Sequence, residues 1–89
     1  MQIKTVRDLG ALVRDQRRTL GWTLDDLAAR TPMSRRWVAD VEAGKPGVAV
    51  GPLLSLLAVL DVELSAGKRD TAGDATLDAY LKDLREEQQ

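Results

Sequence analysis

The stretch GWTLDDLAARTPMSRRWVADVEAGK, residues 21–45, decides the fold of this 89-residue chain. It contains two short helical patterns, residues 24–30 and residues 35–43, with a break between them. Pro32 lies in the break, and a proline disfavours the helical conformation in the residue before it. We therefore expect the first helix to end near Arg30.

The residues that flank the second pattern suit the two ends of a helix. Ser34 precedes it and can accept hydrogen bonds from the free amides of the first turn. Gly44 follows it, where the left-handed conformation that closes many helices suits glycine. A helix, a short turn and a second, capped helix together predict a helix-turn-helix.

The same residues resemble the repressor/Cro-type helix-turn-helix, the XRE family, over roughly residues 5–65. The elements that carry the resemblance are Gly21, Trp22, Thr23, Leu27, Ala28, Ser34, Val38, Val41, Glu42, Gly44 and Lys45. The continuation through residues 45–48, 53–60 and 61–64 is similar to the HipB-like branch, the DNA-binding antitoxins of HipA-type kinase toxins. The resemblance implies an all-α, repressor/Cro-like bundle of four to five helices with one short C-terminal dimerisation strand.

Two positions depart from the family pattern. The family usually has glycine in the turn where this chain has Pro32, which cannot adopt a left-handed conformation. The turn must therefore be built in another way. The family also often begins the first helix of the motif with a glutamine that reaches a phosphate, and Leu24 cannot make that contact.

The composition argues against catalysis. The chain has no histidine and no cysteine, so it lacks the commonest general base and any thiolate metal ligand. We expect no enzyme activity, no metal and no cofactor. The N-terminal residues do not resemble a signal peptide and no apolar run approaches ~20 residues, so we expect a cytoplasmic protein without a membrane segment.

The small net charge conceals an uneven distribution. Residues 1–60 carry nine Lys/Arg against six Asp/Glu, a net charge of +3. Residues 61–89 carry four Lys/Arg against eight Asp/Glu, a net charge of −4, which gives the total of −1. A basic front and an acidic tail suggest two surfaces with different partners, although charges on a solvated face explain the pattern equally well.

The first helix is expected to begin at Thr5, with Asp8 completing a capping box, and to end near Leu20. In the XRE family, which this sequence resembles, an arginine at the position of Arg17 pairs with a glutamate at the position of Glu42. The resemblance therefore implies a structural ion pair that fixes the first helix against the second helix of the motif. A direct role of Arg17 in DNA binding is the less favoured alternative.

The N-terminal end of the helix at residues 35–43 is the part of this motif that reaches base edges. Arginine can bind guanine O6 and N7 through two hydrogen bonds, and Asp40 has the spacing to orient Arg36 or to accept from a cytosine. An exposed polar face is the alternative interpretation, and the motif favours DNA. The candidate DNA-binding residues are Thr23, Ser34, Arg35, Arg36, Asp40 and Lys45.

Residues 53–60 are apolar on more than one side, which is typical of a helix that is covered on more than one side. Residues 61–65 alternate between polar and apolar, which is the pattern of a half-buried strand. Such a strand needs a second strand to pair with its backbone N–H and C=O groups. The simplest pairing strand is the same segment of a second chain. The predicted homodimer contacts are Leu57, Leu60, Val62 and Leu64.

We therefore divide the chain into a DNA-binding and dimerisation domain (1–65), a linker (66–73) and a C-terminal amphipathic helix or tail (74–89). The predicted function is a sequence-specific repressor on an inverted-repeat operator in double-stranded DNA. The resemblance adds the role of an antitoxin that binds a HipA-like kinase toxin and regulates its own operon. The alternative is a toxin-neutralising protein-interaction module with weak or no DNA binding.

Overall fold

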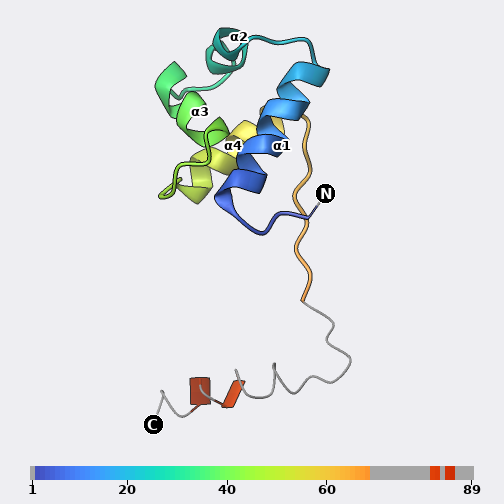
Figure 1. Ribbon diagram of the computed structural model, residues 1–89, viewed down its shortest axis with the longest axis vertical. Coiled ribbons are helices and arrows are strands. Elements are labelled where there is room, and N and C mark those ends of the chain that lie inside the picture. Colours follow the sequence, from blue (N-terminus) through green and yellow to red (C-terminus); the bar gives the residue numbers. More distant parts are fainter. Residues whose placement is uncertain (1, 69–80, 83, 86–89) are drawn as a thin grey trace.

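The computed structural model describes residues 2–68, 81–82 and 84–85. Its four principal helices are α1 (Val6–Thr19), α2 (Leu24–Ala29), α3 (Arg35–Glu42) and α4 (Val50–Val59) (Figure 1). The helix α3 packs against both α1 and α2. The part of the chain that the structure describes contains helices and no strand, which confirms the predicted all-α class.

Side chains cap the N-terminal ends of the first three helices, as the sequence predicts. The Thr5 hydroxyl accepts from the Asp8 amide at 3.2 Å, and the Asp8 carboxylate accepts from the Thr5 amide at 3.2 Å. Thr23 caps α2 through a second capping box of the same kind. The Ser34 hydroxyl accepts from the Trp37 amide at 3.0 Å at the start of α3. Each cap satisfies amides that a helix leaves without a partner.

Three helices end with a residue in the left-handed conformation. Gly21 and Gly44 take φ values of 74° and 76° after α1 and α3. Asp61 takes φ 59° after α4, and the next amide, that of Val62, donates to the carbonyl of Leu57 at 2.8 Å. This 6→1 hydrogen bond, together with a 5→2 bond from Asp61, defines a Schellman motif. Asp61 therefore closes a helix.

The strand predicted at residues 61–65 is not shown by the single chain, and Asp61 lies outside it. Asp61 belongs to the end of α4, and residues 62–68 have no regular secondary structure in the single chain. Alternation of polar and apolar residues marks a segment that is half covered, but a strand also needs a partner for its backbone groups. The prediction of a C-terminal helix at residues 74–89 falls mostly outside the described residues, as does most of the predicted linker.

The turn between α2 and α3 is organised by the hydroxyl of Thr31. This hydroxyl donates to the Ala28 carbonyl at 3.0 Å and accepts from the Met33 amide at 3.1 Å. A side chain thus supplies the hydrogen bonds of the reversal, and Pro32 sits exposed between the two bonded residues without a left-handed conformation. This is how the chain replaces the glycine that the family usually has at this point.

The hydrophobic core lies where α1, α2, α3 and α4 meet. Its buried residues are Val13, Leu27, Val38, Val41, Leu53, Leu56, Leu57 and Leu60. Leu57 and Leu60 are 1% and 0% exposed, so they are already covered within one chain. This corrects their prediction as dimer contacts, since apolarity alone does not tell which side of a helix faces its own core. The exposed apolar side chains of α4 are Val50 and Leu54, at 67% and 47%.

A glycine lets α1 approach α3 closely. A Cβ atom on Gly10 would lie 2.5 Å from the Val41 carbonyl oxygen and 2.6 Å from the Glu42 carbonyl oxygen. Real Cβ atoms do not come so near to backbone oxygens, so only glycine fits at this crossing. The close approach also brings the side chains of α1 within reach of the C-terminal end of α3.

Candidate nucleic-acid interface

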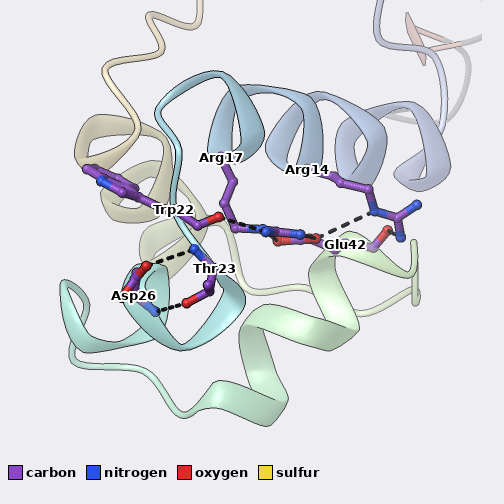
Figure 2. Close-up of polar contacts among 6 residues, drawn as sticks. All are labelled: Arg14, Arg17, Trp22, Thr23, Asp26 and Glu42. Atoms are coloured by element: carbon purple, nitrogen blue, oxygen red, sulfur yellow. Dashed lines mark hydrogen bonds and ion pairs between the residues drawn. The ribbon is translucent and has the colours of Figure 1, made fainter.

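The helix α3 is fixed to α1 by a nearly buried ion pair. Arg17 Nε donates to Glu42 Oε2 at 2.8 Å and Arg17 Nη2 donates to Glu42 Oε1 at 3.0 Å (Figure 2). The two side chains are 14% and 6% exposed. This is the two-point contact for which the guanidinium geometry is suited, and it is the pair that the family resemblance implies.

The remaining nitrogen of the same guanidinium ties a third segment to this pair. Arg17 Nη1 donates to the backbone carbonyl of Trp22 at 2.9 Å, in the loop before α2 (Figure 2). The hydrogen bonds to Glu42 raise the pKa of Arg17, so it stays charged at any ordinary pH. Arg14 approaches the other side of the Glu42 carboxylate, with Nε 3.5 Å from Oε1. One arginine thus holds α1, the loop and α3 in a fixed relation.

The exposed end of α3 carries the residues predicted to read DNA. Ser34, Arg35 and Arg36 are all exposed, and the Ser34 cap fixes the start of the helix beneath the two arginines. Arg35 Nε pairs with Asp25 Oδ1 of α2, with side chains 62% and 75% exposed. Among the described residues, Arg36 has no ion pair and extends from the surface.

The structure corrects one of the two contacts expected of Asp40, the one with Arg36. Asp40 Oδ1 lies 3.1 Å from Lys45 Nζ, across the C-terminal end of α3. It therefore pairs with Lys45 and not with Arg36, although the i,i+4 spacing to Arg36 permits that contact. The Schellman ending at Gly44 folds Lys45 back toward α3, with its amide donating to the Asp40 carbonyl at 3.1 Å. The sequence spacing alone could not show this fold-back.

Thr23 lies at the exposed start of α2 and serves as its cap. Its hydroxyl accepts from the Asp26 amide at 3.0 Å, and its amide donates to the Asp26 carboxylate at 2.9 Å (Figure 2). The hydrogen bond from the Thr23 backbone lowers the pKa of Asp26, with the Thr23 side chain adding to the effect. The hydroxyl proton of Thr23 remains available to donate to an acceptor on a ligand.

Two residues of this surface were not predicted from the sequence. Asp25 was not among the predicted DNA-binding residues, yet it contacts Arg35 from a neighbouring helix. Arg30 lies over the ring of Trp22, 4.2 Å from its centre. Opposite charges placed at the starts of two helices joined by a tight turn are a signal that could have revealed the first contact.

Two other kinds of site were not found in the part of the chain that the structure describes. Within it, no group of three or more carboxylates could hold a metal ion. No helix in that part is long and apolar enough to cross a membrane. Exposed hydroxyls and cations lie together at the starts of α2 and α3, namely Thr23, Ser34, Arg35 and Arg36. Such groups are suited to phosphates and base edges.

The model of a protein family described as "Helix-turn-helix domain" matches residues 8–67 of the chain. The chain belongs to this helix-turn-helix family. It is 41% identical over 59 residues to an uncharacterized HTH-type transcriptional regulator, y4mF, of Sinorhizobium fredii, covering 66% of this chain and 78% of that protein. The predicted family is thereby confirmed.

Two solved structures have a similar fold. One is described as a HipA-HipB-O2-O3 complex and the other as a HipB-O4 20mer complex. Each matches with a TM-score of 0.70 at 16% identity and covers 79% of this chain and 99% of the other. The predicted HipB-like arrangement of helices is therefore confirmed. The helix-turn-helix chain is a DNA-binding transcriptional regulator and not an enzyme, as predicted.

Proposed function

We propose that this helix-turn-helix chain is a sequence-specific repressor that binds an inverted-repeat operator as a homodimer. The observation that carries the proposal is the exposure of Arg35 and Arg36 at the capped start of α3, a helix that Arg17 and Glu42 hold in place. In this motif, the N-terminal residues of the second helix contact base edges in the major groove. A helix that is fixed from behind can present two arginines in a reproducible position.

The surrounding groups have different roles in this proposal. Arginine can bind guanine O6 and N7 with two hydrogen bonds, so Arg35 and Arg36 contribute to sequence preference. Thr23 and Lys45 lie where a hydroxyl and an ammonium would meet phosphates, which carry no sequence information. Lys45 is 57% exposed and forms an ion pair with Asp40, so a contact between Lys45 and a phosphate adds only modestly to the affinity for DNA.

The dimer contact that we propose uses exposed apolar residues. Val50 and Leu54 lie one turn apart on the outer side of α4, and Leu64 follows this helix with 52% of its surface exposed. Val62 is partly buried against the core of its own chain. A chain of this size gains stability by covering such residues with a second copy. The two α3 helices would then lie about 34 Å apart, in successive major grooves.

We further propose that the regulator is the antitoxin of a HipA-like kinase toxin and represses its own operon. The support is the likeness of fold to HipB in a HipA-HipB complex. A HipA-like kinase gene beside the gene for this chain is the expected observation. Co-expression should then yield a complex of the two proteins that remains intact in gel filtration.

A protein-interaction module that does not bind DNA is the second candidate. Two observations favour it: Arg35 is engaged by a carboxylate, and Leu24 offers no polar group at the start of α2. The two candidates differ in their response to salt. Affinity for DNA falls steeply as the salt concentration rises, because the release of condensed counterions then gains less free energy, whereas an apolar protein contact changes little.

Selection of binding sites from a random duplex pool tests the repressor. The expected pool contains an inverted repeat, and Arg36→Ala should lower affinity for the selected site by about 1–3 kcal/mol while relaxing preference at one base pair. Lys45→Ala should weaken selected and scrambled sites alike. Lys82→Ala, outside the residues matched by the family, is a control with the same change of charge. A pool without a repeat, together with unchanged binding by Arg36→Ala, would support the interaction module.

The oligomeric state is measured separately by sedimentation. The expected mass is about twice the 9.7 kDa of one chain. Leu54→Glu should shift the protein to the monomer mass and weaken binding to the full repeat more than binding to a half-site. A monomer of the unaltered chain at the concentration that saturates DNA would contradict the dimer.

A further inference from the structure

The ion pair between Asp25 and Arg35 joins the starts of α2 and α3 on the face that carries the DNA-binding candidates. The carboxylate Oδ1 contacts Arg35 Nε, and both side chains are more than half exposed. A pair that is so exposed adds little to the stability of a fold. The main effect of this pair is therefore on the position of the Arg35 side chain.

The contact with Asp25 is made through Nε of Arg35 and leaves the terminal edge of the guanidinium group facing away from the carboxylate. A guanidinium has five N–H donors in a rigid plane, and Asp25 contacts Nε, the nitrogen nearest to the chain. The two terminal nitrogens, Nη1 and Nη2, form the opposite edge of the plane. Two parallel donors from one such edge are what a guanine accepts at O6 and N7. The carboxylate thus restrains the rotation of Arg35 without occupying the edge that would meet a base.

We propose that Asp25 is a specificity-determining residue, which positions Arg35 for a guanine and disfavours DNA that offers none at that place. The proposal rests on the function proposed above. Before binding, Asp25 restricts the rotamers of Arg35, so less side-chain freedom is lost in the complex. When DNA excludes water from the surface, the attraction between the two charges becomes stronger.

The second half of the proposal follows from the charge of Asp25. Non-specific binding depends on cations that neutralise phosphates. A carboxylate at this surface repels phosphates and withholds part of the charge of Arg35 from them. The carboxylate therefore lowers the affinity for every DNA sequence. At a site with the matching guanine, the contact of the positioned Arg35 compensates for this decrease. Asp25 should raise the ratio of specific to non-specific affinity.

The test is titration of Asp25→Asn on the selected operator and on a scrambled duplex. Affinity for the scrambled duplex should rise, and the ratio of the two affinities should fall about tenfold, within the discrimination that one guanine contact provides. Asp15→Asn removes the same charge from an exposed position of α1 and should leave the ratio unchanged. Asp25→Glu keeps the charge with a longer side chain and should recover part of the ratio.

A variant that lacks the arginine separates positioning from simple repulsion. In the Arg35→Ala background, Asp25→Asn should raise affinity for both duplexes equally and leave the ratio constant. Circular dichroism melts establish that each variant is folded before titration. An unchanged ratio for Asp25→Asn in the unaltered background would overturn this inference while leaving the repressor intact. Equal affinity of the unaltered protein for operator and scrambled duplexes would overturn both.

Discussion

Two ion pairs of the same chemistry attach α3 to its neighbours, and their surroundings give them opposite roles. Arg17 and Glu42 are 14% and 6% exposed and join α3 to α1 through two hydrogen bonds. Arg35 and Asp25 are 62% and 75% exposed and join α3 to α2 through a single nitrogen. Burial makes the first pair costly to break, whereas exposure leaves the second pair able to exchange partners. One end of α3 is therefore fixed and the other is available for binding.

The largest expected effect is the loss of the buried carboxylate. Glu42→Ala leaves Arg17 with only the Trp22 carbonyl as a partner in a nearly buried place. Removal of one member of a buried pair costs about 3–5 kcal/mol, because the other charge stays uncompensated. Chemical denaturation of the single variant should show this loss in the free energy of unfolding.

A double-mutant cycle then apportions the effect to the pair. Arg17→Ala and the double variant Arg17→Ala/Glu42→Ala should show strong coupling, so that the double variant loses much less than the sum of the single losses. Arg14 is the matched control: its side chain is 44% exposed and it approaches the same carboxylate less closely. Additive losses in the cycle would contradict the pairing that fixes α3.

The next effect concerns the crossing that brings the buried pair together. Gly10→Ala places a methyl group 2.5 Å from a backbone oxygen of α3, so α1 and α3 must separate. Overpacking of this kind costs about 1–3 kcal/mol. Gly51 is the control, because a Cβ atom there meets nothing within 4 Å. If Gly10→Ala melts at the same temperature as Gly51→Ala, the close approach of the two helices is not needed.

Much of this fold could be predicted from the sequence because its signals are local. Caps at Thr5, Thr23 and Ser34 depend on residues three positions away, and helix endings at Gly21 and Gly44 depend on backbone freedom. Such patterns can be recognised without knowledge of the tertiary structure. The turn at Pro32 could not, since its geometry depends on a hydroxyl with several possible partners.

The errors have a common physical origin in the choice between competing partners. Leu57 and Leu60 were assigned to a second chain, although the core of the same chain covers them. Asp40 was predicted to orient Arg36 or to accept from a cytosine, and the glycine ending brings Lys45 to it. In each case the sequence established the type of residue and its spacing. Which neighbour it met depended on the placement of the other helices for the two leucines, and on the backbone ending at Gly44 for Asp40.

A smaller effect, set by pH, distinguishes the start of α2 from the buried pair. The pKa of Asp26 is lower in the fold than its ordinary value, because the Thr23 backbone amide donates a hydrogen bond to its carboxylate and the Thr23 side chain adds to the effect. The unfolded chain therefore binds more protons in acid. The stabilisation of the fold by Asp26 is complete above the ordinary carboxyl pKa, at a pH of about 4. It is lost as the pH falls through the lower pKa that Asp26 has in the fold.

Melting temperatures measured between neutral pH and acid check this dependence. Asp26→Asn should be less stable than the unaltered chain at neutral pH, and the difference should shrink as the pH falls below the ordinary range of a carboxyl group. The pKa of Arg17 is raised, so its contribution is present below the unfolded value and persists throughout this window. A constant difference between the two proteins across the window would contradict the role of Asp26.

The smallest expected effect on stability is that of the exposed pair. Asp25→Ala, Arg35→Ala and the double variant should reveal a coupling of about 0.2–1 kcal/mol in the free energy of unfolding. Salt should reduce this coupling further, because the Debye length falls below ~10 Å above 0.1 M. The coupling between Arg17 and Glu42 should change little, since those two side chains are nearly buried and salt screens buried charges much less. A salt-independent coupling of several kcal/mol for Asp25 and Arg35 would instead show that Arg35 holds α2 and α3 together. Arg35 would then serve the fold, and the assignment of this end of α3 to DNA would depend on Arg36 alone.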